Sequence, residues 1–140
     1  MSFLLKTNQF KRQFTTLARQ LNKMEYLVIV FDKPGSVCIP TTDCGGLQDR
    51  SQIRAKHVAN IPNAVANHGV TNVGAIYKDE SKTEFAGSAY NIKANSKEEI
   101  MEFLKSDPYV EAGIWDLSNV QIWPYGCAGR LPVDVVGTKK

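Results

Sequence analysis

The sequence predicts a single α+β domain with the ferredoxin-like order β-α-β-β-α-β, in which an antiparallel four-stranded sheet carries two helices on one face. Three observations support this fold class. A chain of 140 residues is long enough for one compact domain and too short for two ordinary ones. Its composition, 43% hydrophobic and 22% charged, is typical of a globular protein. Strand-like and helix-periodic segments follow one another in the order of that fold.

The first strand is expected at residues 25–31, EYLVIVF, because this run is rich in β-branched and aromatic residues. Residues 31–46 are dense in Gly, Pro, Thr and Asp and are expected to form a loop. YLVIVF is apolar at six consecutive positions, which predicts that both faces of the strand are buried. Two helices cover only one face of the sheet, so we expect a second copy of the chain to cover the other face in a homodimer.

A long helix is expected at residues 47–68, where residues of the inward side recur at a spacing of four. These inward residues are Ile53, His57, Ile61 and Val65. Pro62 is expected to kink or divide the helix, since proline removes one backbone donor and crowds the preceding turn. Gly69 is expected to end it.

The other main elements are expected at residues 70–77 (strand), 84–92 (strand), 96–106 (helix) and 115–123 (strand). The helix opens with Ser96 and Glu99 at capping-box spacing. In the last strand, the apolar residues change parity after Leu117, which predicts a β-bulge.

The segment KSDPYVEAG predicts a further short helix between Asp107 and Gly113. Asp107 can cap this helix, and Pro108 suits its first position because that residue needs no backbone donor. Gly113 can end it in a left-handed conformation. Two interpretations of Asp107 stay open at this point: a structural cap, or a carboxylate that also has a functional partner elsewhere in the chain.

Residues 1–23 form a basic N-terminal extension that contains five Lys or Arg residues and no Asp or Glu. At helical spacing its Phe and Leu residues gather on one side and most of its basic residues on another. This combination is typical of a mitochondrial presequence, so we expect a protein of the mitochondrial matrix. The alternatives are an ordinary amphipathic helix packed on the domain, or an upstream extension of no consequence, and either would fit a cytoplasmic protein. The folded domain is expected at residues 24–126, and a C-terminal tail at residues 127–140.

The net charge of +3 resides in this extension. The other 12 basic residues are outnumbered by 14 acidic ones, so residues 25–140 sum to −2. A nucleic-acid-binding domain usually carries a basic patch on its folded part, and we therefore expect no nucleic-acid partner. No apolar run approaches the roughly 18 residues that span a bilayer, so no membrane segment is expected.

The three cysteines, Cys38, Cys44 and Cys127, are too few and too irregularly spaced for a disulfide framework. No Cys/His cluster has the spacing of a structural zinc site. We therefore expect neither a metal nor a cofactor. A thiol or metal site built on Cys38 and Cys44 is the less favoured alternative, because both would have to converge with a histidine.

Several stretches resemble the YciI-like (YCII-related) proteins, small members of the dimeric α+β barrel superfamily. They are MEYLVIVFDK, RAKHVANI, GVTNVGAIY, GSAYNIKANSKEEIMEFLKSDPYVEAGIWD and VQIWPY, within residues 24–126. DPYVEAG, together with the upstream R-x-x-H, is the most specific part of this resemblance. The resemblance implies a ferredoxin-like fold that dimerises through its sheet. It also implies an active site built on a His–Asp pair, which in this sequence is His57 and Asp107.

The resemblance suggests a class of chemistry as well. One relative that acts in chlorinated-aromatic breakdown is a dehydrochlorinase, and muconolactone isomerases of the wider superfamily move protons on small cyclic acids. A histidine oriented by a carboxylate can take a proton through its free nitrogen and return it elsewhere. We expect a cofactor-independent lyase or isomerase that uses His57 and Asp107 on a small cyclic or aromatic acid. The alternative is a non-catalytic homodimer that binds a small ligand or has an accessory role.

Four further residues are candidates for binding the substrate: Arg54, Ser88, Tyr109 and Trp115. Arg54 precedes His57 by three residues and so lies on nearly the same side of the helix, where it could hold a carboxylate or phenolate. A solvated surface arginine is the alternative. The two aromatic residues can wall an aromatic ligand or simply pack in the core. The loop between Asp32 and Arg54 is longer than the family pattern suggests, so no particular substrate is carried over.

Overall fold

The structure, a computed structural model, describes residues 23–35 and 50–131. Its elements are β1 (Met24–Asp32), α2 (Arg50–Asn67), β2 (Val70–Tyr77), β3 (Phe85–Ala94), α3 (Lys97–Lys105), α4 (Pro108–Glu111) and β4 (Trp115–Pro124). The expected presequence helix and the two loop cysteines, Cys38 and Cys44, lie outside the described residues.

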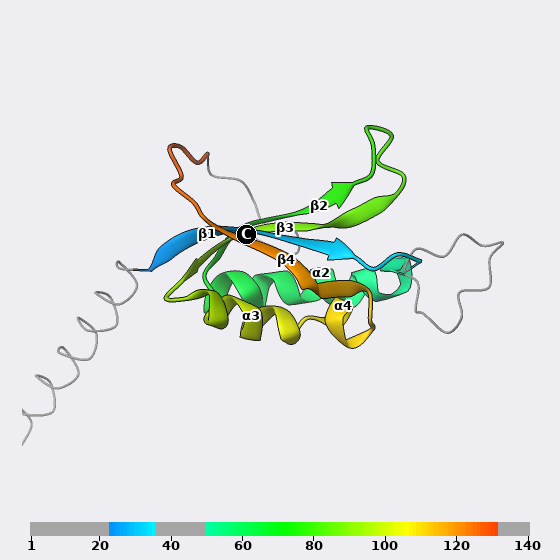
Figure 1. The fold of residues 1–140 in the computed structure, drawn as a ribbon, viewed down its shortest axis with the longest axis horizontal. Coiled ribbons are helices and arrows are strands. Elements are labelled where there is room, and N and C mark those ends of the chain that lie inside the picture. The colour runs from blue at the N-terminus through cyan, green and yellow to red at the C-terminus, as the bar shows by residue number, and fades with distance from the viewer. Residues whose placement is uncertain (1–22, 36–49, 132–140) are drawn as a thin grey trace, which may run out of the picture.

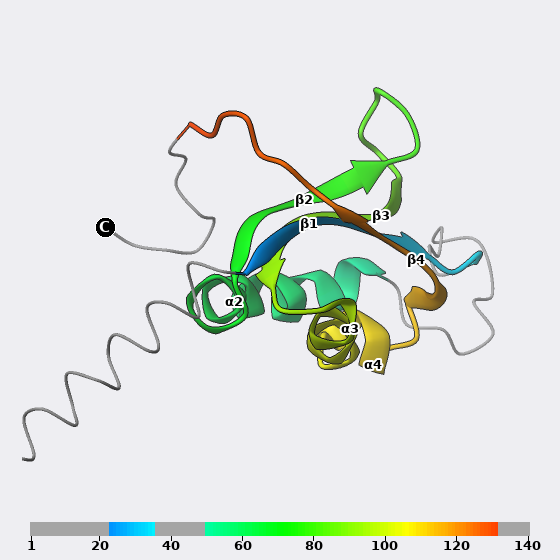
Figure 2. The same cartoon turned by 60° about the vertical axis from the view of Figure 1, so that its left-hand side comes forward.

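The four strands form one antiparallel sheet in the order β2-β3-β1-β4, and the helices cover one face of it (Figures 1 and 2). This confirms the predicted ferredoxin-like arrangement. β1 lies in the middle of the core, where Val28 pairs with Tyr90 of β3 and with Ile122 of β4. Val28 and Val30 are completely buried beneath the helices. The predicted bulge is present as well, because the register shifts between Ile29 and Phe31 where β1 pairs with β4.

The structure corrects two details expected of the long helix, a division at Pro62 and an inward Val65. α2 runs continuously from Arg50 to Asn67, so Pro62 does not divide it. Proline removes only the one hydrogen bond that its own nitrogen would make, and the bonds on either side can hold the helix together. Val65, expected on the inward side, is 38% exposed, and Ala64 is buried in its place. A spacing of four drifts by roughly 40° at each step around a helix of 3.6 residues per turn, so the fourth residue of that series has turned outward.

The outer face of the sheet carries apolar side chains, and none of the helices among the described residues covers this face. Tyr26, Val28 and Val30 point towards the helices, so the alternate residues of β1 point the other way. Phe31 is exposed there, and Trp123 of β4, which pairs with Leu27, is 59% exposed. Residues 125–131 continue from β4 on this same side of the sheet (Figure 2).

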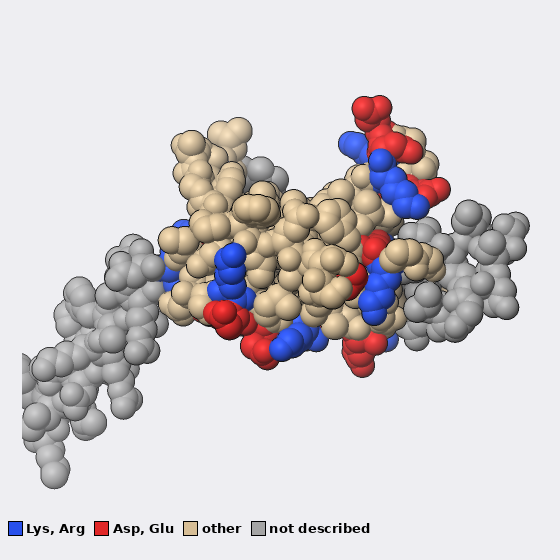
Figure 3. Space-filling model, viewed as in Figure 1, with Lys and Arg blue, Asp and Glu red and all other residues tan. Residues whose placement is uncertain are grey.

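Charged side chains of both signs are interspersed on the face shown in Figure 3, and neither sign forms a continuous patch there. None of the helices in the described part of the chain combines the length and the apolar character needed to cross a membrane.

Candidate functional site

Asp107 is held in place by the short helix that follows it. It is the N-cap of α4, and its Oδ1 accepts a hydrogen bond from the backbone N–H of Tyr109 at 2.9 Å. Pro108 takes the first helical position, where its missing donor is not needed. Gly113 then turns the chain with φ of +72°, a conformation that favours glycine. The carboxylate is thus fixed in a buried position, with Asp107 only 3% exposed.

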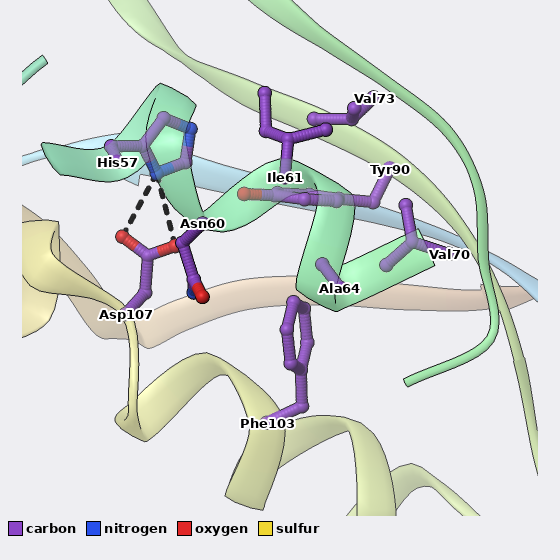
Figure 4. Close-up of a pocket in the computed structure, with 9 residues that line it drawn as sticks. All are labelled: His57, Asn60, Ile61, Ala64, Val70, Val73, Tyr90, Phe103 and Asp107. Carbon is purple, nitrogen blue, oxygen red and sulfur yellow. Dashed lines mark hydrogen bonds and ion pairs between the residues drawn. The ribbon is translucent and has the colours of Figure 1, made fainter. Parts of the chain in front are cut away.

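His57 of α2 meets this carboxylate from across the fold (Figure 4). Its Nδ1 lies 3.0 Å from each carboxylate oxygen, and both side chains are buried. A hydrogen on Nδ1 would be donated to Asp107, which leaves Nε2 as the nitrogen that can exchange a proton with another group. The two interpretations of Asp107 are therefore compatible, because one carboxylate caps α4 and also orients the imidazole.

Two aromatic rings fix the plane of the imidazole. The ring of Tyr109 stacks against His57 with centroids 4.2 Å apart and an interplanar angle of 22°. The indole of Trp115 approaches edge-on, at 5.4 Å and 76°. A ligand-binding wall and core packing were both open for these two aromatic residues, and the structure places both against His57, almost completely buried. Burial also raises the pKa of the Tyr109 phenol.

Arg50 is a residue of this region that the sequence did not single out. Its guanidinium forms a buried ion pair with Asp32 at the end of β1. Its Nη2 donates to the backbone oxygen of Gly87 at 3.1 Å and to the hydroxyl of Ser88 at 3.2 Å. The guanidinium carbon also lies 4.6 Å from the ring centre of Tyr109, which ties this ion pair to the His57 stack.

The ion pair has an unfavourable component as well as a favourable one. Burial raises the pKa of Asp32, and the positive charge and hydrogen bond of Arg50 only partly offset that effect. The signal that could have revealed Arg50 is its spacing of seven residues, or two helical turns, from His57, which puts both on one side of α2.

The candidates for binding substrate thus fall into two groups. Ser88 is buried and hydrogen-bonded to Arg50, so its hydroxyl is already engaged. Arg54 is exposed and is not part of the buried cluster around His57, although its positive charge acts on the Tyr109 phenol. Its role in binding a substrate stays a prediction.

A small cavity, here called the His57 cavity, lies between α2, the sheet and α3 (Figure 4). Its lining residues are His57, Asn60, Ile61, Ala64, Val70, Val73, Tyr90, Phe103 and Asp107. Its volume is about 10 Å³, which is close to the minimum that holds one water molecule. The described residues contain no cluster of three or more His, Cys, Asp or Glu side chains that could hold a metal ion.

Two of the relatives that a comparison with known proteins gives are named for biosynthesis. Aspercryptin biosynthesis cluster protein B of Emericella nidulans is 33% identical over 106 residues, which cover 72% of this chain and 62% of that protein. Fusaric acid biosynthesis protein 2 of Gibberella fujikuroi is 41% identical over 39 residues, which cover 28% of this chain and 38% of that protein. The chain therefore spans less than two thirds of the length of these relatives.

Among solved structures, the chain is similar to 5-chloro-2-hydroxyhydroquinone dehydrochlorinase from Burkholderia phenoliruptrix AC1100 in complex with 2,5-dihydroxybenzoquinone. The TM-score is 0.54 at 25% sequence identity, and the match covers 74% of this chain and 96% of that one. The sequence profile of the YCII-related domain matches residues 24–124, the whole span from β1 to β4. The chain therefore belongs to the YCII-related domain family.

Proposed function

We propose that this protein is a cofactor-independent lyase or isomerase that moves a proton on a small cyclic or aromatic compound bearing oxygen substituents. The observation that carries the proposal is the buried pair of His57 and Asp107 beside a cavity, with Nδ1 held 3.0 Å from the carboxylate. A positioned acid/base of this kind typically contributes about 10² to 10⁴ in rate.

In the proposed mechanism, Nε2 of His57 accepts a proton from a carbon next to a carbonyl group. The electrons of the broken C–H bond form a carbon–carbon double bond, and the carbonyl π electrons move onto the oxygen. When the carbonyl re-forms, the electrons of the new carbon–carbon double bond either form a double bond to the adjacent carbon and expel a leaving group from it, or take the proton back from His57 at another carbon. In the first case the imidazolium then gives its proton to the departing group or to solvent. Asp107 stabilises the imidazolium that forms in between, because an opposite charge within hydrogen-bond distance favours the charged form.

Two features support the class of substrate. The rings of Tyr109 and Trp115 surround the imidazole, and aromatic rings of this kind suit a flat, cyclic compound. The structural neighbour is a dehydrochlorinase of a hydroxylated aromatic compound and was solved with a dihydroxybenzoquinone. The first relative belongs by its name to a biosynthesis cluster, which also fits chemistry on small molecules.

The test is turnover of hydroxylated quinones, aromatic acids and lactones by the wild type and two histidine variants. His57→Asn should lower turnover by about 10² to 10⁴ while the circular dichroism spectrum stays unchanged. His68→Asn is the matched control, since the exposed His68 is the other histidine of the chain. A wild type that binds such compounds and turns none of them over would favour the non-catalytic, ligand-binding alternative.

We further propose that the protein is a homodimer joined through the outer face of the sheet. The support is the apolar surface of that face, where Trp123 is 59% exposed beside Leu27 and Phe31 is 37% exposed. Large exposed apolar patches mark interaction sites. Sedimentation should give a dimer for the wild type and a monomer for Trp123→Glu. Val65→Glu, an exposed apolar residue on α2, should leave the dimer intact. A monomeric wild type would contradict this proposal.

A further inference from the structure

Tyr90 supplies a hydroxyl group to the His57 cavity, and this hydroxyl has no role in the mechanism proposed above. It lies on β3, it is 2% exposed, and it is one of the lining residues together with His57 and Asp107. In Figure 4 its ring crosses the cavity and its hydroxyl end points towards the side where His57 and Asp107 meet. The rest of the lining is mainly apolar, so this hydroxyl is one of few hydrogen-bonding groups there.

The ring of Tyr90 is held from both sides by other aromatic residues. Phe103 of α3 meets it edge-on, with centroids 6.1 Å apart and an angle of 84°. Trp115 of β4 does the same at 6.0 Å and 90°. Edge-to-face contacts at these separations are favourable and fix the ring. The direction of the hydroxyl is therefore set by packing.

The state of this hydroxyl is also set by its surroundings. Burial, with the negative charge of Asp107 as the next contribution, raises the pKa of Tyr90 well above its ordinary value. The phenol therefore keeps its proton at any ordinary pH and acts as a hydrogen-bond donor. Because Tyr90 belongs to the lining of the cavity, this donor faces whatever occupies the cavity.

We infer that the His57 cavity is a binding site for a single oxygen atom, with the Tyr90 hydroxyl as its donor. In the free protein this atom belongs to a water molecule, for which about 10 Å³ is just sufficient. In the complex it is a carbonyl or phenolic oxygen of the substrate, which displaces that water. The inference rests on the proposed function for the identity of this second occupant.

The geometry gives the substrate oxygen a chemical reason to lie there. When His57 takes a proton from the neighbouring carbon, negative charge develops on the carbonyl oxygen. A fixed donor at that oxygen stabilises the charge, and removal of one such donor typically costs about 10² to 10³ in rate. Tyr90 keeps its own proton throughout and only donates a hydrogen bond. Asn60 and Ile61 are partly exposed, so the remainder of the substrate lies past these two lining residues.

The first experiment is a high-resolution crystal structure of the free, full-length wild type. The expected result is one water molecule within hydrogen-bond distance of the Tyr90 hydroxyl. A cavity without any density would overturn the inference, whatever the activity of the protein.

The second experiment measures binding of 2,5-dihydroxybenzoquinone by calorimetry. Tyr90→Phe should weaken binding by about two- to tenfold, the effect of one hydrogen bond to a neutral oxygen. Tyr26→Phe is the matched control, since it removes a hydroxyl from a buried tyrosine that does not line the cavity, and it should bind as the wild type does.

These readouts separate the two proposals. Equal affinity of Tyr90→Phe and Tyr26→Phe overturns the inference about Tyr90 even if the wild type is active. Weaker binding by Tyr90→Phe supports it even if turnover is never found and the proposed reaction fails. If the wild type does not bind the quinone at all, the water position in the free structure decides the question.

Discussion

The guanidinium of Arg50 lies 4.6 Å from the ring centre of Tyr109, and the same ring stacks against His57 at 4.2 Å. Arg50 and His57 are two turns apart on α2, so Tyr109 bridges two positions of one helix. Arg50 in turn joins Asp32 and Ser88 of two neighbouring strands. The orientation of the imidazole thus depends on a stack that reaches from α4 to the sheet.

Replacing Tyr109 tests this stack directly. Tyr109→Phe should leave the His57 ring protons near their wild-type NMR positions, because the ring is retained. Tyr109→Leu should move them downfield, because the shielding by the stacked ring is lost, and should cost about 0.5 to 1.5 kcal/mol of stability beyond the change in buried area. Identical His57 resonances in all three proteins would contradict the stacked arrangement.

Removing Arg50 should destabilise the protein through the partner that it leaves behind. Arg50→Met leaves Asp32 buried and unpaired, which typically costs about 3 to 5 kcal/mol, as measured by urea unfolding. The double variant Arg50→Met/Asp32→Leu should recover much of this loss, since both charges are then gone. Arg54→Met, an exposed arginine of the same helix, should change stability by no more than about 0.5 kcal/mol. A double variant as unstable as Arg50→Met would show that the loss has another cause.

The order of the elements was predictable from the sequence because each element carries a local signal. β1 has a continuous apolar run, and α3 opens with Ser96, whose hydroxyl accepts from the backbone N–H of Glu99. The direction of Val65 was not predictable from a spacing of four, because a small angular error accumulates along 18 residues of helix. Pro62 does not divide the helix, because tertiary packing can hold a helix together across one missing hydrogen bond.

The candidate site was predictable only where a motif carried it. His57 and Asp107 are 50 positions apart, and it was the family resemblance that paired them. Arg50 and Asp32 have no such motif, and the contact that joins them forms between a strand end and a helix start that no local periodicity connects. Tyr90 reads as an ordinary inward residue of β3, and only the packing of α2 and α3 around it reveals a cavity.

Ionised Glu99 stabilises the fold, so the stability should fall at acidic pH as Glu99 loses its charge. A hydrogen bond from Lys23, with one from the backbone N–H of Asn95, lowers the pKa of Glu99 in the folded protein. The ionised Glu99 side chain therefore contributes its full stabilisation at pH values above its pKa in the unfolded chain, about 4.3. This stabilisation is lost as the pH falls through the lower pKa of Glu99 in the folded protein. Glu99→Gln should be less stable than the wild type at pH 7, and this difference should close in strong acid.

The measurement is urea unfolding of the wild type and Glu99→Gln at several pH values. Glu102→Gln is the control, because Glu102 lies on the same helix and its side chain is 72% exposed. Glu102→Gln should change the free energy of unfolding by no more than about 0.5 kcal/mol. A stability difference for Glu99→Gln that does not change between pH 7 and strong acid would rule out the proposed role of the charge.

Gly87 should not tolerate a side chain, because the strands around it leave no room for one. A Cβ at this position would meet the backbone oxygen of Val30, which cannot move aside without disturbing the pairing of β1 with β3. The Gly87 carbonyl also accepts from Arg50, so a shift there would reach the stack on Tyr109. Gly87→Ala should therefore destabilise the protein by about 1 to 3 kcal/mol or more.

Gly74 on the neighbouring strand β2 provides the matched control for Gly87→Ala. A Cβ on Gly74 would meet no atom within 4 Å, so Gly74→Ala should be neutral or should stabilise the chain by about 0.5 to 1 kcal/mol, because alanine loses less backbone freedom than glycine on folding. Both free energies of unfolding are measured at the same protein concentration, with sedimentation of each variant. Equal stability of the two variants would mean that β3 shifts freely at Gly87, and Arg50 would then have no fixed carbonyl to hold its guanidinium against Tyr109.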